Sequence, residues 1–535
     1  MTPARGRPMD RRLRVRGWLR TQTPLHVGGV AVDPAEALPV AVDGQDRVYV
    51  PGTSLAGALR AWMRGADPRP EVLDDLWGFA DDGEPGGARA SRVVVRDAVI
   101  TATTGTDGDG IPDDPLDPRS LPVRHGVGID RVTGAAAPGF LYARTIVPPG
   151  RYLAFELDIE TTLDHLDRDR ARLHALLAAL KAEEVGLGAG NGRGLGVVTL
   201  LPSPLAVHEH DFTGRAGLLA FLGGEPEPFD ESRVDESAAD LPARREMLTV
   251  QLRWRPDAPV MVRATGEGAA INTLPLTTEI GRDAVRLTLS GSSLKGALRG
   301  HAEFIERTAR GLDAPPPPLR DGEDDDAARR HAGAFLDQLD ELDAVRALFG
   351  AARREDARGH PWGAGALRVH ECVSETAVPS EVWDIVVDGL PDDDPDPALR
   401  PPVRDALAAR GLDQADHVAI DRWTGGAADH LLFSVLEPHG IDWEPIRLTV
   451  DLTRLGGHRD VAVALLLLVL RDLERRRIPL GGMVNRGFGD VTITSVEFRG
   501  NGWTSRTTLA DALRGEGPAA AWREYTTLEP TGGAR

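Results

Sequence analysis

The sequence contains little cysteine and little lysine. Cys372 is its only cysteine, which excludes an internal disulfide framework and any metal site built from several cysteines. A single cysteine is typical of proteins kept in a reducing compartment, so we expect a cytoplasmic protein. Lys181 and Lys295 are the only lysines, and arginine therefore supplies almost all of the positive charge.

Long apolar runs are also absent. The longest apolar stretch, residues 461–470, is too short to span a bilayer. Residues 1–19 are basic but lack the apolar core of a signal peptide. We therefore expect no association with a membrane.

Acidic residues outnumber basic ones, and the formal net charge is −20. Taken alone, this balance argues against binding of nucleic acid, which needs a positive surface. The acids, however, gather in Pro- and Asp-rich stretches at 225–240, 321–328 and 391–397, which are typical of linkers and exposed insertions. The net charge therefore says little about the folded cores.

Several short motifs occur twice in the chain, in the same order each time. Such ordered recurrence indicates a tandem repeat rather than chance similarity. The repeated motifs are PGTSLAGALR at 51–60 and SGSSLKGALR at 290–299, GVGIDRVTGAA at 126–136 and HVAIDRWTGGA at 417–427, and the glycine-rich loops at 186–200 and 479–493.

The repeat predicts two domains, at residues 1–203 and 245–500. We expect an acidic linker at 204–244 and a C-terminal tail at 501–535. The second repeat carries extra sequence between its first two motifs, which we assign to an acidic insertion near 313–330.

Each repeat shows the same coarse order of elements: strand, short helix, two strands, helix, glycine loop and strand. The opening strand at 12–20 alternates in polarity. The second helix of repeat one has leucines spaced to form one face, at 173, 176, 177 and 180. This order is β-α-β-β-α-β, which predicts an α+β protein with two ferredoxin-like (RRM-like) domains that carry long insertions.

The first helix of each repeat follows small and hydroxyl-bearing residues. Free N–H groups at a helix start, together with the helix dipole, bind anions such as phosphate. Alternatively, Thr53 or Ser54 caps the helix and the glycines only permit close packing. The occurrence in two copies favours the phosphate interpretation, with the candidate residues Thr53, Ser54, Arg60, Ser292, Ser293, Lys295 and Arg299.

The two glycine-rich loops each present one arginine, Arg193 or Arg486. Glycine is expected where the backbone needs a positive φ or approaches a partner closely, and an arginine fork suits a pair of phosphate oxygens. The alternative is a tight helix-to-strand turn with a solvated arginine. The loop glycines are Gly188, Gly190, Gly192, Gly194, Gly196, Gly481, Gly482, Gly487 and Gly489.

The Ile-Asp-Arg-x-Thr-Gly segments allow two interpretations. Arg131 and Arg422 could contact an RNA backbone. Equally, Asp130 and Asp421 could hold these arginines in structural ion pairs.

On these motifs the chain resembles the RAMP superfamily of CRISPR effector proteins, specifically the backbone subunit of type III complexes. Two such domains in one chain resemble the fused subunits of some type III systems. The matching segments are LHVGG at 25–29, VPGTSLAGALR at 50–60, SRVVVRDA at 91–98, GIDRVTGAA at 128–136, GRGLG at 192–196, LSGSSLKGALR at 289–299, AIDRWTGGA at 419–427 and NRGFGDV at 485–491.

The resemblance implies that each domain binds successive nucleotides of a guide CRISPR RNA in antiviral defence. It also implies contacts with target single-stranded RNA and with other effector subunits, and a thumb-like insertion that interrupts the guide–target duplex. No tightly bound cofactor is expected. Recognition should depend on the RNA backbone and shape rather than on base identity.

The resemblance further implies target cleavage by an Asp two residues before a Pro-apolar pair. Here those positions hold Ala37 and Thr273, so the nearby Asp33 is the acid we expect to replace it, with Mg²⁺ or Mn²⁺ assisting. An alternative function is that of a RAMP-family endonuclease that processes the guide precursor. Its general acid or base would be His26, His125, His301 or His417.

Overall fold

The computed structural model describes residues 8–30, 36–79, 88–108, 110–129, 136–224, 227–281, 283–313, 339–351, 363–389 and 399–527. The chain divides into two compact units, which are treated separately below. The first unit takes residues 1–124, 143–191 and 195–245, and the second takes 125–142, 192–194 and 246–535.

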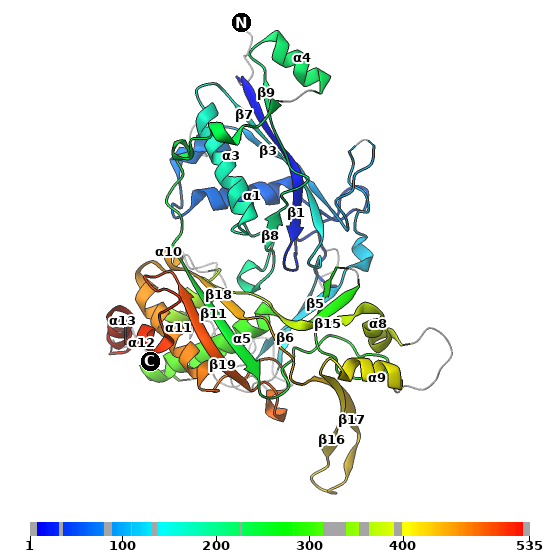
Figure 1. Cartoon of the computed structure of the whole chain (residues 1–535). Coiled ribbons are helices and arrows are strands. Elements are labelled where there is room, and N and C mark those ends of the chain that lie inside the picture. Colours follow the sequence, from blue (N-terminus) through cyan, green and yellow to red (C-terminus); the bar gives the residue numbers. More distant parts are fainter. Residues whose placement is uncertain are drawn as a thin grey trace, which may run out of the picture. The chain divides into compact units, whose positions relative to one another are not determined.

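The first unit has the predicted β-α-β-β-α-β order. The paired strands run β8, β1, β7 and then β3 and β4, which is the strand order of a ferredoxin-like sheet. Helices α1 and α3 lie together on one side of this sheet in Figure 1. In chain order the elements are β1 (Arg11–Thr21), β2 (Tyr49–Val50), α1 (Gly52–Arg64), α2 (Asp74–Trp77), β3 (Val93–Val95), β4 (Ala98–Thr101), β7 (Tyr152–Thr161), α3 (Leu166–Lys181) and β8 (Val198–Leu200).

The apolar periodicity of the sequence explains this packing. Leu13, Val15 and Leu19 of β1 are completely buried, while the arginines between them face the other side of the sheet. The predicted leucine face of α3 is buried to at least 95%. Because burial of a leucine contributes roughly 1.5–3 kcal/mol, this face contributes substantially to holding the helix on the sheet.

The predicted linker contains ordered elements of the first unit. Strand β9 (Ala206–Asp211) pairs antiparallel with the first half of β1, and β10 (Glu227–Pro228) pairs with β9. Helix α4 (Arg215–Gly223) lies between these strands. Among the described acids of the stretch at 225–240, only Glu227 lies in a strand; Asp230 and Asp235 cap short 3-10 turns, the second of which packs on α3.

The second unit repeats the same topology. Its main sheet has the order β14-β18-β11-β19, and helices α5 and α11 share one core with it. The apolar run at 461–470 is buried within α11. The elements are β11 (Met247–Pro256), α5 (Gly291–Arg310), β14 (Leu367–Val369), β18 (Ile446–Asp451), α10 (Leu452–Leu455), α11 (Arg459–Glu474) and β19 (Val491–Arg499).

Insertions enlarge this second unit, and two helices within the predicted C-terminal tail, at 509–514 and 516–527, pack against α11. A small antiparallel sheet has the order β12-β13-β15, and β16 and β17 form a hairpin that projects at the bottom of Figure 1. A second hairpin, β5 with β6, belongs to repeat one by sequence. These elements are β5 (Val123–Ile129), β6 (Ala136–Thr145), β12 (Thr277–Ile280), β13 (Ala284–Leu289), α7 (Asp343–Phe349), β15 (Cys372–Pro379), α8 (Ser380–Asp388), α9 (Pro401–Ala408), β16 (Leu412–Ile420), β17 (Ala427–Pro438), α12 (Leu509–Arg514) and α13 (Glu516–Thr527).

No helix in the described part of the chain combines the length and the apolar character that a bilayer crossing requires.

Candidate nucleic-acid interface

The first glycine loop is held by main-chain groups of the segment that follows β1. The N–H of Ala189 donates to the carbonyl of His26 (2.8 Å), and the N–H of Gly196 donates to that of Pro24 (2.9 Å). Gly188 has φ +71°, and a Cβ there would lie 2.3 Å from the His26 oxygen. No other residue type fits this position without moving the backbone.

The second glycine loop has the same main-chain frame. The N–H of Gly482 donates to the carbonyl of Met261 (2.8 Å), and the N–H of Gly489 donates to that of Pro259 (2.9 Å). Gly481 has φ +87°, with a virtual Cβ 2.4 Å from the Met261 oxygen. The tight-turn interpretation therefore accounts for the glycines next to the frame.

The other predicted glycines fall into two groups. Gly190, Gly194, Gly196, Gly487 and Gly489 also have positive φ, whereas Gly192 and Gly482 do not. Gly487 differs from Gly481 because a Cβ there would meet open space. The exposed tip of the second loop is therefore free to approach a ligand closely.

Each loop arginine sits in a short 3-10 turn, at 191–193 and 484–486. Arg193 is half-buried as a residue, and its Nη1 donates to the hydroxyl of Tyr142 (2.8 Å). Arg486 is exposed, and its Cζ lies 4.8 Å from the ring centre of Phe433. Both arginines thus project from the main-chain frame, and both rest on an aromatic ring.

The starts of the first helices differ from the prediction. Pro51, not Thr53 or Ser54, is the N-cap of α1, and it makes no side-chain capping hydrogen bond. Thr53 and Ser54 are exposed within that turn. The Asp97 carboxylate accepts from the N–H of Gly52 (2.7 Å) and so already occupies part of the site proposed for an anion.

In the second unit the helix start is capped by a serine. Ser290 is the N-cap of α5, and its hydroxyl accepts from the N–H of Ser293 (3.3 Å). The hydroxyl of Ser292 lies 3.1 Å from that of Ser290. Ser292 and Ser293 are half-buried, so this end of the helix is partly satisfied within the protein.

Three predicted cations on the first helices have partners in the protein. The guanidinium of Arg60 donates to the carbonyl of Gly78 (3.1 Å), and that of Arg299 pairs with Glu303 (2.8 Å). The ammonium of Lys295 donates to the carbonyl of Leu367 (2.6 Å). Each of these contacts restrains a side chain that we expected to be free for phosphate.

Lys295 lies in a group of positive charges within the second unit. Its ammonium also donates to the carbonyl of Gly192 (3.2 Å). Burial, reinforced by Arg299, Arg193 and Arg368, lowers the pKa of Lys295 to about 8. Desolvated cations that repel one another favour binding of an anion nearby.

The β16–β17 hairpin carries the second Ile-Asp-Arg-x-Thr-Gly segment at its tip. The Asp421 carboxylate accepts from the N–H groups of Thr424 (2.8 Å) and Trp423 (2.7 Å), which lowers the pKa of Asp421. Among the described residues no ion pair joins Asp421 to Arg422, which is exposed. The Trp423 side chain is 96% exposed. Asp130 and Arg131 lie outside the described residues.

The loop that would carry a catalytic acid is described only in part. Asp33 lies outside the described residues. The N–H of Leu38 donates to a carbonyl of β6 (2.9 Å), and that of Thr273 donates to the corresponding carbonyl of β17 (3.0 Å). Thr273 is thus the equivalent of Leu38, and Asn272 is the equivalent of Ala37, one residue earlier than expected. Neither position holds a carboxylate.

The histidine candidates differ in their surroundings. His26 is buried, its Nδ1 lies 2.7 Å from the carbonyl of Thr145, and burial lowers its pKa. The Nε2 of His301 lies 2.9 Å from Asp472, whereas His125 is exposed. His417 is treated below. Within the described ranges, no three His, Cys, Asp or Glu side chains gather to hold a metal ion.

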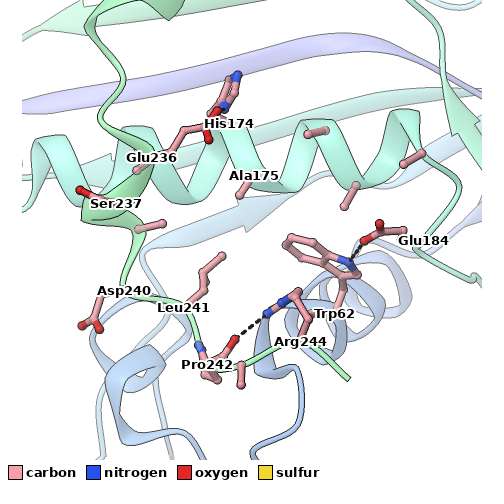
Figure 2. A pocket seen from close by; sticks show the side chains of 16 residues that line it. Trp62, His174, Ala175, Glu184, Glu236, Ser237, Asp240, Leu241, Pro242 and Arg244 are labelled. Carbon is pink, nitrogen blue, oxygen red and sulfur yellow. Dashed lines mark hydrogen bonds and ion pairs between the residues drawn. The ribbon is translucent and has the colours of Figure 1, made fainter. Parts of the chain in front are cut away.

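A hollow of about 680 Å³ lies elsewhere in the first unit, between α3 and residues 236–244. Figure 2 shows Arg244 beside Trp62, whose indole N–H donates to Glu184 (2.9 Å). Alanines of α3 form much of its wall, and none of the predicted RNA-binding residues lines it. The hollow therefore does not extend the candidate interface.

Sequence reasoning missed the aromatic partners of the two arginines. Tyr142 and Phe433 each stand six residues beyond the alanine that starts the second hairpin strand, at Ala136 and Ala427. This shared spacing was available in the sequence, but nothing in it links the rings to arginines about 50 residues further along the chain.

Comparison with known proteins gives one family. The sequence profile of the RAMP superfamily matches residues 18–199 and 273–492, which together make up most of the chain. No curated protein gives a significant match.

Proposed function

The chain belongs to the RAMP superfamily, and on that premise we propose that it is a guide-RNA-binding backbone subunit of a type III CRISPR effector complex in antiviral defence. Membership of the superfamily supports a CRISPR-associated role in RNA binding in general. The observation that carries the finer proposal is the main-chain frame that occurs in both repeats. Each repeat presents one arginine from this frame, as expected of a protein whose two domains bind successive parts of one RNA strand.

The proposed binding mode uses the RNA backbone. The outward face of the first sheet carries cross-strand ion pairs, for example Arg14 with Asp158 (2.7 Å), and no exposed aromatic side chain among its described residues. Stacked bases, as on an RNA-recognition motif, are therefore not expected there. The loop arginines and the cations near Lys295 would instead meet phosphates.

We assign the thumb-like role to the β16–β17 hairpin. Its tip combines an exposed arginine with an almost fully exposed tryptophan, Arg422 and Trp423. An indole exposed to this extent is costly in water, and a base or a base pair would cover it. The other partners in this proposal are target single-stranded RNA and further effector subunits.

Charge reversal at the second glycine loop tests the proposal. Arg486→Glu should weaken binding of single-stranded guide RNA and lower the slope of log K against log salt by about 0.7 or more, since one phosphate contact is lost. Arg299→Glu should act in the same direction. Arg506→Glu, an exposed arginine of the same unit outside the interface, is the matched control. Equal slopes for wild type and Arg486→Glu would contradict the proposal.

Any target cleavage is proposed to come from repeat one alone. Asp33 is the only acid near that position which we assign to catalysis, and the described residues of repeat two offer Asn272 instead. We expect at most one cut per copy, dependent on Mg²⁺ or Mn²⁺, which Asp33→Ala abolishes while guide binding persists. Two cuts per copy, or unchanged cuts in the variant, would refute this assignment.

Processing of the guide precursor is the second candidate function. It is favoured by His417, whose Nε2 lies 2.8 Å from Glu437 and whose ring stacks on Phe433. A histidine oriented by a carboxylate is suited to general acid–base catalysis. Cleavage of precursor RNA by the pure protein, lost in His417→Ala, would establish this function in place of the first.

A further inference from the structure

Each glycine-loop arginine is clasped by one aromatic side chain, but the two clasps differ. In repeat two, the Cζ of Arg486 lies over the ring of Phe433, 4.8 Å from its centre. In repeat one, the Cζ of Arg193 lies 5.9 Å from the ring centre of Tyr142, and its Nη1 donates to the phenol oxygen (2.8 Å). The phenol hydroxyl is therefore one chemical difference between the two arrangements.

The aromatic rings are themselves held by the opposite hairpin strand. Phe433 pairs with His417 in the register of β16 and β17, and the two rings stack at 5.4 Å with 13° between their planes. The equivalent of His417 in repeat one is Gly126, and a Cβ there would lie 2.4 Å from the Cζ of Tyr142. The Tyr142 ring therefore lies across the glycine.

The hydroxyl changes what the arginine can offer. Arg193 is half-buried and has one N–H committed to Tyr142. Arg486 is exposed, and among the described residues its guanidinium has neither a hydrogen bond nor an ion pair. A cation–π contact leaves all five N–H donors of a guanidinium free. Two parallel N–H groups of a free guanidinium can then bind two oxygens of one phosphate.

We propose that Phe433 and Tyr142 are positioning residues that set how firmly each repeat holds the RNA backbone. Phe433 orients Arg486 by stacking and leaves its fork available to a phosphate. Tyr142 orients Arg193 through its hydroxyl and withdraws part of the fork. This inference rests on the RNA-binding function proposed above. It predicts that adding a hydroxyl to the ring at 433 weakens the phosphate contact of that repeat, and that removing the hydroxyl at 142 strengthens the contact of the other.

The exchange can be made directly in the full-length protein. Phe433→Tyr should lower the slope of log K against log salt for a mixed-sequence single-stranded RNA by a part of the about 0.7 that one complete phosphate contact contributes. Tyr142→Phe should raise that slope by a similar amount. Arg486→Ala sets the scale of a complete loss, and thermal unfolding of each variant reports on the clasp as a purely structural contact.

The outcomes separate the inference from the function on which it rests. A wild-type chain that binds no RNA refutes the proposed function. If RNA binds and Arg486→Ala lowers the slope, but neither exchange changes it, the function stands and the inference falls. Changes in unfolding temperature at constant slope overturn it as well, because the aromatic rings would then be structural only. Opposite shifts in the two exchange variants support it.

Discussion

The outward faces of the two sheets differ in charge although their strands have the same order. In the first unit, arginines of β1 face acids of β7, and Arg14 makes a two-pronged contact with Asp158 (2.7 and 2.9 Å). In the second unit, Arg368 and Arg447 occupy the corresponding face, and no ion pair to either is found among the described residues. Arg14 of the first face is thus paired with an acid, whereas the described residues of the second face keep Arg368 and Arg447 without an ion pair beside one paired arginine, Arg253 with Glu497 (3.6 Å).

The charges of the second face are strong enough to affect their neighbours. Burial, together with Arg368 and Arg447, lowers the pKa of His370 to about 4. Arg368 also contributes to the lowered pKa of Lys295. The comparison teaches that duplication preserved the backbone and redistributed the electrostatics, so the second repeat should contribute more to RNA binding than the first.

The largest effect is expected where the two repeats agree. Gly481→Ala should destabilise the protein by about 4 kcal/mol, because the new Cβ meets a carbonyl oxygen while the backbone keeps a positive φ. Gly188→Ala should cost a similar amount. Gly487→Ala, with the same φ but open space, should cost only about 1 kcal/mol. Urea unfolding measures the free energy of unfolding of all three variants. Equal losses of stability in Gly481→Ala and Gly487→Ala would show that the contact with the main-chain frame is not the cause.

A smaller effect should distinguish the repeats by pH. In the second unit Glu306 is buried and accepts from the hydroxyl of Tyr525 on α13 and from the N–H groups of Ala344 (3.2 Å) and Val345 (2.8 Å). Burial raises its pKa from 4.5 to about 7. The folded state therefore holds the proton more tightly, and stability should fall by up to about 3 kcal/mol as pH rises from 4.5 to 7.

Variants at this carboxyl group isolate its contribution. Glu306→Gln should remove this part of the pH dependence, measured as unfolding temperature between pH 5 and pH 8. Tyr525→Phe removes a hydrogen bond that lowers the pKa of Glu306 in the folded state, so the decline should begin at the same pH and extend to higher pH. A Glu306→Gln protein with the wild-type pH profile would show that other groups titrate instead.

The smallest effect concerns the sheet faces themselves. Arg447→Ser should weaken RNA binding a few-fold and lower the salt slope by about 0.7. Arg16→Ser is the matched change in repeat one, where the exposed arginine pairs with Glu156 (3.4 Å), and it should leave both quantities unchanged. If both variants changed RNA affinity and the salt slope equally, the proposed electrostatic difference between the repeats would be wrong.

Much of the fold could be predicted because local pattern and repetition agree. The alternation of β1 and the leucine spacing of α3 indicated elements that the structure contains. Strand β9 was not foreseen, because its pairing with β1 joins residues about 195 apart, and the acidic stretch that follows it at 225–240 suggested a linker. Local composition carries no information about such a partner.

The candidate site was less predictable, because its decisive features are long-range contacts. The arginine clasps join a hairpin to a loop distant in sequence, and the capping of Gly52 by Asp97 does likewise. Aligning the two repeats on their prolines placed Thr273 opposite Ala37. The main-chain hydrogen bonds instead place Asn272 there, and this shift could not be predicted from the sequence. The roles of Asp33 and Arg131 stay predictions.

The main-chain cage of the glycine loops has a consequence for how such a gene can evolve. His26 and Met261 perform the same task through their carbonyl oxygens, although one side chain is polar and the other apolar. Selection on the cage therefore acts on the glycines and leaves the facing residues free to drift. The two duplicated halves can therefore diverge far in sequence while their glycine loops remain interchangeable. Replacing residues 186–196 by the sequence of residues 479–489 should give a chimera that folds.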